Sequence, residues 1–370
     1  MTQQIQLYPL LLVPKMSKAI WGGRALVERF HKPGLPEDMF GESWECWDEN
    51  PVANGPLAGR TVGQLRARLG AALMGEFDPA RLFPILTKII DAHRNLSVQV
   101  HPDDAYARRV EHQENGKTEC WYILEADPDA ALYLGWNRPT DRAEYERRVV
   151  DGTLGALLRR VPVEPGQAYY LPAGTLHAIG AGIVLFEVQQ TSDLTYRIFD
   201  WNRVGGDGKP RPLHVEKAGD VLDFSAARFS VMASLTYELE GLQRTALICD
   251  PRFWVERIDV DAVGGEVDLE GMPLVAMALG APVRIVYGEG TVELAAFQSA
   301  LVPAGLGNVH FSASSSREAG LLAAAPPADH EALRRRLASA GVSAERSGAF
   351  LEQFAAARGA GQGTVKPLAR

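Results

Sequence analysis

The sequence has few cysteines, no long apolar run and no excess of positive charge. Its three cysteines, Cys46, Cys120 and Cys249, form no CxxC pair, so we expect buried, inert thiols rather than a disulfide framework or a thiolate metal site. There is no run of about 18 apolar residues. The N-terminal segment has neither a basic leader nor a small-residue cleavage site, which predicts a cytoplasmic protein without a membrane segment. The formal charge of −8, without a Lys/Arg-rich stripe, argues against nucleic acid as a partner.

What remains is an ordinary globular composition around one unusual stretch. The 370 residues, 46% hydrophobic and 23% charged, suffice for two or three units with sizeable cores. The stretch from Gly166 to Arg203 begins with a strand, a tight turn at Pro172 and Gly174, and a second strand at His177. Proline fixes φ and glycine supplies positive φ, so we expect a rigid hairpin that presents the imidazole.

Polar residues recur on one face of the neighbouring predicted strands. Ser97, Gln99 and His101 alternate with apolar residues, and Lys117 alternates with Glu119 in the same way. A lone histidine in a strand is usually a hydrogen-bonded core residue, but His177 is accompanied by the polar residues of these neighbouring strands. Two imidazoles, one carboxylate and one amide oxygen suit a borderline divalent ion. The predicted ligand set is Gln99, His101, Glu119 and His177, while His93 and His112 lie outside these faces and are expected at the surface.

Several motifs also carry a family resemblance. The run G-x5-P-x-G-x2-H, preceded by a Q-x-H strand and a glutamate, resembles the paired metal-binding motifs of cupins. More narrowly, the chain resembles the type I mannose-6-phosphate isomerases in their short bacterial form. The motifs that carry this resemblance are LSVQVHPDD, GKTE-x-WYIL, LPAGTLHAIG and FEVQQTSDLTYRIFDWNR. Together with Trp21–Gly23 and Gly41–Glu45, it extends over about the first 215 residues.

The resemblance implies an enzyme that interconverts mannose 6-phosphate and fructose 6-phosphate by moving a proton between C1 and C2. It implies one zinc ion per chain on the four predicted ligands, although a glutamine ligand leaves manganese or cobalt open. It places Arg197 at the reacting oxygens, and Arg203 with Ser97 at the phosphate. A desolvated lysine near a cation can act as a neutral base, so Lys117 is one candidate base and Glu187 is its rival.

One departure from the family limits what can be transferred. Long-form members carry a histidine beside the lysine, where this chain has Gly116. A ring-opening role for that histidine therefore does not carry over.

The predicted architecture is mainly β, with two cupin (jelly-roll) barrels, a helical excursion and a short helical C-terminal tail. Residues 1–223 would form the catalytic unit, 224–325 a second unit without metal, and 326–370 the tail. The second unit repeats the hairpin: Leu301–Asn308 aligns with Tyr170–His177, which puts Asn308 in the place of the histidine. A capping box predicts a helix from Thr61 to Leu69, and Thr140 is expected to cap a helical segment that extends to Arg160.

Three other functions fit parts of the pattern. A cupin oxygenase or oxalate-degrading enzyme would use manganese or iron, usually with three histidines, whereas this chain offers two plus Gln99. A non-catalytic sugar-binding cupin is possible if Lys117 and Arg197 only neutralise buried carboxylates. A different sugar-phosphate isomerase could use the same scaffold. The basic loop 204–212 would either border the site entrance or form a solvated linker.

Overall fold

A computed structural model describes residues 6–204, 208–225, 231–288, 290–315, 319–326 and 330–361. It is mainly β, as the sequence predicts, and its strands form four antiparallel sheets. In the described part of the chain, no helix has the length and apolar character needed to cross a membrane. All three cysteines are buried free thiols, as expected.

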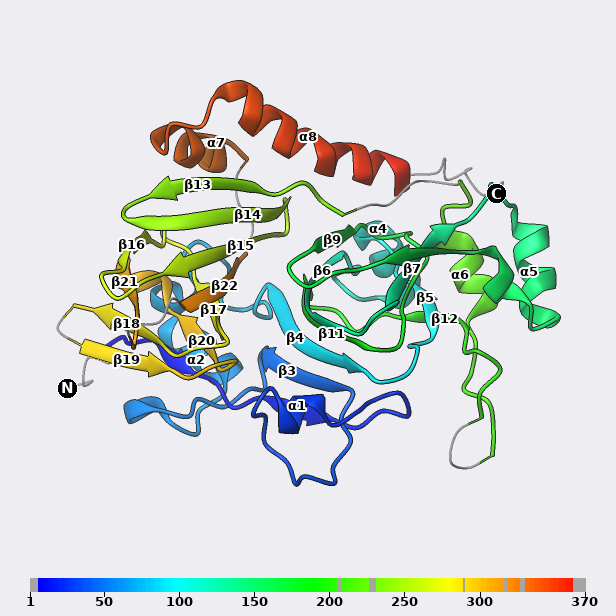
Figure 1. Ribbon diagram of the computed structural model, residues 1–370, viewed down its shortest axis with the longest axis horizontal. Coiled ribbons are helices and arrows are strands. Elements are labelled where there is room, and N and C mark those ends of the chain that lie inside the picture. The colour runs from blue at the N-terminus through cyan, green and yellow to red at the C-terminus, as the bar shows by residue number, and fades with distance from the viewer. Residues whose placement is uncertain are drawn as a thin grey trace.

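Two facing sheets hold the predicted ligands, and they form the right-hand half of Figure 1. The six-stranded sheet has the order β2 (Lys15–Ser17), β3 (Glu42–Cys46), β4 (Ile85–Ala92), β11 (Ile183–Gln190), β6 (Glu119–Ala126) and β9 (Ala168–Leu171). The five-stranded sheet has the order β12 (Tyr196–Phe199), β5 (Val98–Val100), β10 (His177–Ile179), β7 (Ala131–Trp136) and β8 (Leu158–Pro162). An apolar core that includes Trp121 and Ile179 lies between these two sheets.

The other two sheets form a second facing pair, on the left of Figure 1. The seven-stranded sheet has the order β1 (Leu10–Leu11), β20 (Ser299–Val302), β17 (Leu274–Leu279), β22 (Ala319–Ala325), β15 (Phe253–Val260), β14 (Leu242–Asp250) and β13 (Leu235–Leu239). The four-stranded sheet has the order β16 (Gly265–Asp268), β21 (Asn308–Ala313), β18 (Val283–Tyr287) and β19 (Gly290–Leu294). The N-terminal strand β1 thus pairs with β20, far along the sequence.

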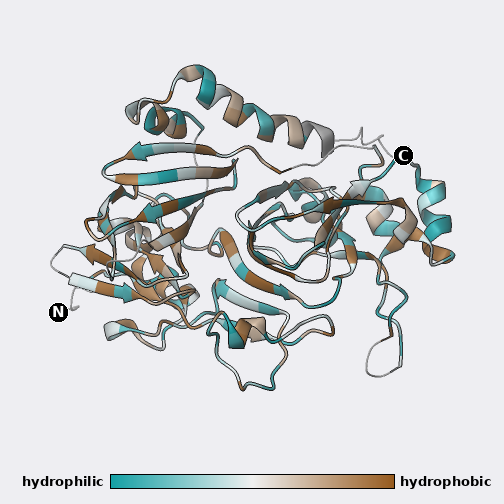
Figure 2. Ribbon diagram, viewed as in Figure 1, coloured by the Kyte–Doolittle hydropathy of each residue, from teal (hydrophilic) through white to brown (hydrophobic). Residues whose placement is uncertain are grey.

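Helices surround the sheets rather than separating them. The α-helices are α1 (Ala25–Glu28), α2 (Val62–Leu69), α3 (Ala71–Met74), α4 (Asp104–Tyr106), α5 (Arg142–Val150), α6 (Val215–Val221), α7 (His330–Ser339) and α8 (Ala344–Gly361). The shorter turns are the 3₁₀ segments η1 (Gly55–Leu57), η3 (Leu154–Leu157) and η4 (Ala304–Leu306), and a π-helical segment η2 (Ala107–Glu111). Figure 2 shows hydrophobic segments concentrated on the strands, whereas α5 is largely hydrophilic.

The local predictions have mixed outcomes. Thr61 caps α2, and the reciprocal bonds of a capping box with Gln64 are both present. The cap of α5 is Asp141 rather than Thr140, because the Asp141 carboxylate accepts the amide hydrogen of Glu144. The helical segment also ends earlier than predicted, since Leu158 already begins strand β8. Strand β13 begins at Leu235, and residues 226–230 lie outside the described part of the chain.

Candidate active site

Three neighbouring strands of the five-stranded sheet carry polar residues on the face that looks into the first sheet pair. His177 lies opposite Gln99, and Gln99 lies opposite Arg197 on its other side. Residues directly opposite each other in antiparallel strands project to the same face. The alternate residues Val98, Val100 and Ala178 pack into the apolar cluster on the other face. The predicted period-two pattern therefore brings Gln99, His177 and Arg197 together.

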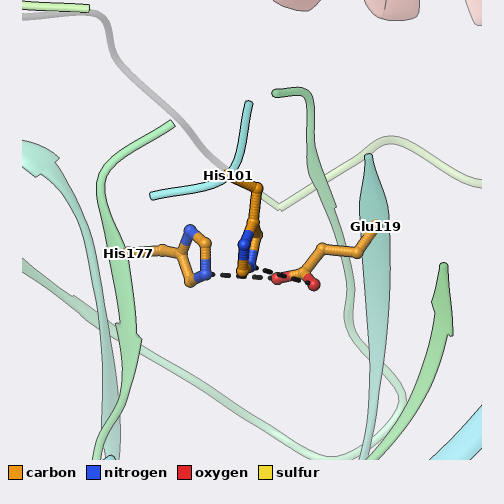
Figure 3. Close-up of side chains that lie close together, drawn as sticks. All are labelled: His101, Glu119 and His177. Atoms are coloured by element: carbon orange, nitrogen blue, oxygen red, sulfur yellow. Dashed lines mark ion pairs between the residues drawn. The ribbon is translucent and has the colours of Figure 1, made fainter. Parts of the chain in front are cut away.

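The six-stranded sheet supplies the carboxylate from across the gap. Glu119 is the first residue of β6, and His101 follows directly after β5. Figure 3 shows the two imidazoles converging on the Glu119 carboxylate. The Nε2 atom of His177 is 3.2 Å from Glu119 Oε1, and Nε2 of His101 is 3.5 Å from Oε2. All three side chains are buried, and their ligand atoms lie within 4.8 Å of one another.

The backbone fixes how the two imidazoles present their nitrogens. His101 Nδ1 donates to the carbonyl of Leu194 at 2.8 Å, and His177 Nδ1 donates to the carbonyl of Thr175 at 2.9 Å. Both Nε2 atoms therefore face Glu119 in the unprotonated form, which is the form that binds a metal. Burial lowers the pKa of His177 and, with help from Lys117, lowers the pKa of His101 to about 3, so both rings are neutral at pH 7.

The group has the features of a metal site. Among the described residues, His177 Nε2 is buried and accepts no hydrogen bond, and the buried Glu119 Oε2 has ion-pair contacts but no hydrogen bond of good geometry. A buried polar atom without a partner is costly. Imidazole nitrogens and a carboxylate are ligands that zinc accepts, and these three lie close enough together to hold one ion. A divalent cation would give His177 Nε2 a partner and bind the Glu119 carboxylate at once.

Lys117 lies beside this group, as predicted. Its Nζ is 2.8 Å from Glu119 Oε2 and 3.3 Å from His101 Nε2. Burial acts to lower the pKa of Lys117, but the carboxylates of Glu119 and Glu187 outweigh it and raise the pKa above its ordinary value. Burial would also raise the pKa of Glu119, but Lys117 and the two histidines hold it well below the usual range. The raised pKa favours the charged ammonium form of Lys117, and the neutral base beside a bound cation stays a prediction.

Glu187 belongs to a buried charge network that the sequence did not reveal. It lies opposite Trp121 on one side and Lys88 on the other, and the Trp121 indole donates to it at 2.8 Å. Lys88 Nζ is 3.6 Å from Glu187 and 3.8 Å from Glu42. Burial and the Glu119 charge raise the pKa of Glu187. The available signal was Lys88 itself, a charged residue within the mainly apolar segment that forms buried strand β4.

The two arginines are placed differently. Arg197 lies on the inner face, with its Nε buried and unpaired among the described residues. Arg203 donates to the Asn95 carbonyl at 2.6 Å and pairs with Asp200 at 2.5 Å, so it lies beside the segment that leads to buried Ser97. Arg211 also pairs with Asp200, at 2.6 Å. Asp200 was not among the predicted site residues, although its position between Arg197 and Arg203 is visible in the sequence.

Gly116 is held so tightly that no side chain fits there. A Cβ at this position would lie 2.4 Å from the Pro102 carbonyl oxygen and 2.4 Å from the Asp103 carbonyl carbon. Contacts this short require the backbone to move. The family's alternative histidine at this position is therefore excluded by the packing as well as by the sequence. His93 and His112 are both exposed, as predicted.

Comparison with known proteins agrees with this geometry. Residues 10–125 match the family model described as the phosphomannose isomerase type I catalytic domain. A mannose-6-phosphate isomerase of Streptococcus mutans is 37% identical over 299 residues, which are 79% of this chain and 89% of that protein. The mannose-6-phosphate isomerase ManA of Bacillus subtilis is 36% identical over 305 residues, covering 81% of this chain and 94% of the relative.

Solved structures give the same result. The crystal structure of the mannose 6-phosphate isomerase from Bacillus subtilis superposes with a TM-score of 0.77 at 31% identity, covering 85% of this chain and 99% of the other. A phosphomannose isomerase mutant from Salmonella typhimurium, at 15% identity and a TM-score of 0.69, shares the fold. The protein is thus a mainly β isomerase with a buried His/Glu/His group. It belongs to the type I phosphomannose isomerase family.

Proposed function

We propose that the protein interconverts mannose 6-phosphate and fructose 6-phosphate, with one zinc ion per chain held by Gln99, His101, Glu119 and His177. The observation that carries the proposal is the buried His101–Glu119–His177 group, with the unpartnered Nε2 of His177 and with Lys117 at its side. A bound zinc ion would polarise the substrate oxygens at C1 and C2 without redox chemistry.

The chain's own residues divide the remaining work. A base has to take a weakly acidic C–H proton while charge develops on the neighbouring oxygen. We assign the proton transfer to Lys117, which would lose its own proton more readily beside a bound cation because like charges repel. Glu187 is the rival base, since burial raises its pKa and so makes its carboxylate a stronger proton acceptor. We assign to Arg197 the stabilisation of the developing oxygen charge, because its inner-face guanidinium has a buried, unpartnered Nε.

The phosphate would bind at the edge of the site. We assign it to Arg203 and Ser97, because a guanidinium offers forked donors that suit phosphate oxygens. Arg203 is held by Asp200 and by the Asn95 carbonyl, two residues before Ser97. These contacts support a preformed donor group rather than a free surface charge.

The proposed architecture is two cupin units, residues 1–223 and 224–325, followed by a helical tail at 326–370. The two facing sheet pairs support it, with β1 contributed to the sheet of the second unit. Reduced, buried cysteines support action in the cytoplasm.

The test is a coupled isomerase assay on protein of measured metal content. Chelator treatment should abolish turnover of mannose 6-phosphate, and zinc should restore it. Manganese and cobalt are added in parallel, to establish which ion gives the highest turnover per bound metal. Full activity in verified metal-free protein would overturn the proposal, and so would metal-loaded protein that binds the sugar phosphate without isomerising it.

A further inference from the structure

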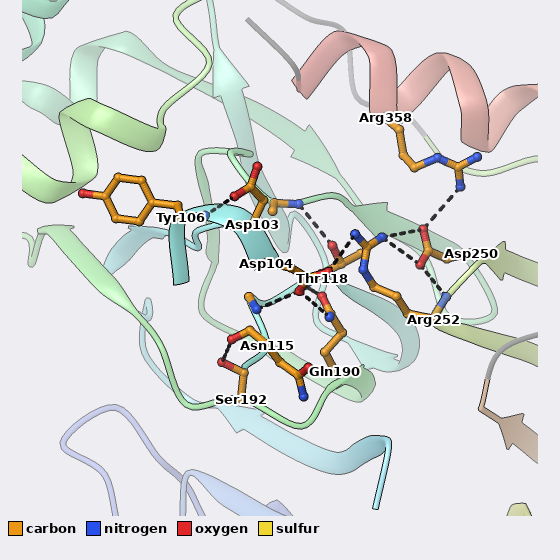
Figure 4. Close-up of polar contacts among 12 residues, drawn as sticks. Asp103, Asp104, Tyr106, Asn115, Thr118, Gln190, Ser192, Asp250, Arg252 and Arg358 are labelled. Carbon is orange, nitrogen blue, oxygen red and sulfur yellow. Dashed lines mark hydrogen bonds and ion pairs between the residues drawn. The ribbon is translucent and has the colours of Figure 1, made fainter. Parts of the chain in front are cut away.

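Lys117 itself lies outside the strand ladder, because it precedes β6, so its position depends on individual hydrogen bonds. Figure 4 shows the bonds around Asp104 and Gln190. The Gly116 amide donates to Asp104 Oδ1 at 2.8 Å, and the Lys117 amide donates to the Pro102 carbonyl at 2.9 Å. The Thr118 amide donates to the side chain of Gln190 at 2.9 Å. Each bond fixes one residue of the segment 116–118.

Asp104 connects these bonds to one another. Its Oδ1 accepts from Gly116 and also from Gln190 Nε2, at 2.9 Å. Gln190 in turn holds Thr118. One carboxylate therefore holds both ends of the segment, directly at Gly116 and indirectly at Thr118. The close packing of Gly116 against residues 102–104 leaves little room for the segment to shift while Asp104 stays in place.

The other oxygen of Asp104 faces the second half of the chain. Arg252, in the turn between β14 and β15, places Nη2 3.5 Å from Asp104 Oδ2. Arg252 is anchored by Asp250, which lies 3.2 Å from its Nη1 and accepts its amide hydrogen at 2.9 Å. Fully buried Asp250 also accepts hydrogen bonds from Tyr170 of β9 and, at 3.3 Å, from Arg358 of α8. Figure 4 shows this line of contacts from α8 to the Asp104 carboxylate.

We propose that Asp104 is a positioning residue for Lys117, and that Arg252 extends this role to the half of the chain that supplies none of the proposed metal ligands. This inference rests on the proposed function, in which Lys117 transfers the proton. The second sheet pair then contributes to catalysis through one ion pair, without contacting the substrate. Loss of Arg252 frees the Asp104 carboxylate to rotate, and Lys117 departs from the geometry that proton transfer requires.

The experiment compares three variants of the full-length, metal-loaded protein. Arg252→Met removes the ion pair to Asp104, and Asp104→Ala removes the carboxylate. Arg358→Met is the matched control, because it removes a different arginine from Asp250 and leaves the Asp104–Arg252 pair intact. Arg252→Lys tests rescue by a conservative change. For each protein kcat, KM, metal content, melting temperature and amide hydrogen exchange of the peptide covering residues 113–119 are measured.

Arg252→Met should lower kcat by about two- to fivefold, the range for a partly exposed ion pair, with KM and metal content unchanged. Asp104→Ala should lower kcat by roughly 10- to 100-fold, because it removes two hydrogen bonds to a charged group. Both variants should speed exchange in peptide 113–119, whereas Arg358→Met changes neither exchange nor kcat. Arg252→Lys should recover at least half of the lost kcat.

The exchange readout separates this inference from the proposed function. Unchanged exchange in Arg252→Met and Asp104→Ala overturns the positioning role, whatever the activity. Faster exchange with unchanged kcat overturns the catalytic half of the inference, whereas the Lys117→Met variant decides separately whether Lys117 is the base. If Arg358→Met lowers kcat as much as Arg252→Met, the effect is general destabilisation, and the inference is wrong. A wild-type protein that does not isomerise the sugar phosphate disproves the proposed function, while exchange still decides the positioning.

Discussion

The two sheet pairs share a hairpin but differ in what that hairpin places between the sheets. In the first pair, β9 leads through Pro172 and Gly174 to His177 at the start of β10. In the second pair, β20 leads through Pro303 to Asn308 at the start of β21. His177 is buried with 1% exposure, whereas Asn308 is exposed. Two similar sequence segments thus lead into equivalent strands, but the side chain of the first strand residue is buried in one and exposed in the other.

The difference comes from the turns. Gly174 has a φ of +86°, and the chain reverses there. In the second hairpin, residues Ala304–Leu306 form a 3₁₀ turn and Gly307 supplies a φ of +69°. The strand that follows is rotated by one residue, so Val309 and Phe311 point into the core and Asn308 points out. The sequence alignment that put Asn308 in the place of His177 is therefore wrong about the direction of its side chain.

The two sheet pairs also differ in the residues that are buried between their sheets. Between the sheets of the second pair the core cluster is apolar, with Ile258, Val283, Ile285, Val309 and Phe311 among its members. The first pair buries Lys88, Lys117, Glu119 and Glu187 in the equivalent space. Buried charges cost free energy unless they are paired, and replacing them with apolar residues is often neutral or stabilising. The second pair fills this space with apolar side chains, so the buried charges of the first pair are not needed merely to fill it.

Converting the first hairpin into a copy of the second should produce the largest loss. His177→Asn removes one ligand atom from the His101–Glu119–His177 group, and we expect metal content to fall and turnover to drop by more than the roughly 100-fold typical of losing an outer-shell partner. Metal analysis of the purified variant and the coupled assay provide the measurement. A variant that keeps its metal and near-normal turnover would show that the ion, if any, binds elsewhere.

Lys117→Met should have the next largest effect. It should lower kcat by roughly 10²–10⁴ while the metal stays bound, the range usual for loss of a general acid or base. Metal content is the essential control, because Lys117 lies 2.8 Å from the ligand Glu119 and its loss could disturb that carboxylate. Near-normal kcat with metal retained would transfer the role to Glu187, and Glu187→Gln then becomes the variant to measure.

The His101–Glu119–His177 group could be predicted from the sequence because the alternation of two separate strands and one turn pointed to the same cavity. Gln99 and His101 share a face of one strand, and Lys117 and Glu119 share a face of the next. The Pro172–Gly174 turn then predicted the position of His177. What the sequence did not predict depends on pairing between distant strands. Lys88 reaches Glu187 only because β4 lies beside β11. Arg252 contacts Asp104 between the two sheet pairs, and the two residues are 148 positions apart in the sequence. No local sequence pattern predicts such a contact.

Turn conformation was the other source of error. The two hairpins have the same number of residues between proline and the following strand, so spacing alone predicted the same direction for His177 and Asn308. The predicted cap of α5 was wrong for a similar reason. Thr140 and Asp141 are both good capping residues, and only the backbone conformation shows that Asp141 has the extended geometry of a cap.

Arg203→Ala should affect binding more than chemistry. A phosphate far from C1 and C2 contributes mostly uniform binding, whose loss raises KM. We expect KM for the phosphorylated sugar to rise by about one to two orders of magnitude, equivalent to roughly 1.5–3 kcal/mol for a hydrogen bond to a charged group, with a smaller change in kcat. Turnover of unphosphorylated mannose should be no worse than in the wild type.

The shared carboxylate makes a control necessary for that variant. Arg203 and Arg211 both pair with Asp200, so either loss leaves that carboxylate with one partner fewer. Arg211→Ala removes the same pairing without removing the proposed phosphate ligand, and its KM should change less. If Arg203→Ala leaves KM unchanged and Arg211→Ala raises it, the phosphate binds at the basic loop between residues 208 and 212.

The smallest change in turnover is expected in the second sheet pair, and it tests the rotated strand directly. Asn308→Ala should leave turnover within about threefold and stability nearly unchanged, as for an ordinary surface substitution. Val309→Ala removes two buried methyl groups from the core and should lower the free energy of unfolding by about 1–3 kcal/mol, again without affecting kcat. Thermal or urea unfolding, followed beside the coupled assay, measures both. If Asn308→Ala lost turnover roughly a hundredfold with the fold intact, the chemistry would belong to the second sheet pair. If Asn308→Ala were the destabilising variant and Val309→Ala the neutral one, the strand would point the other way, and Asn308 would again be the counterpart of His177.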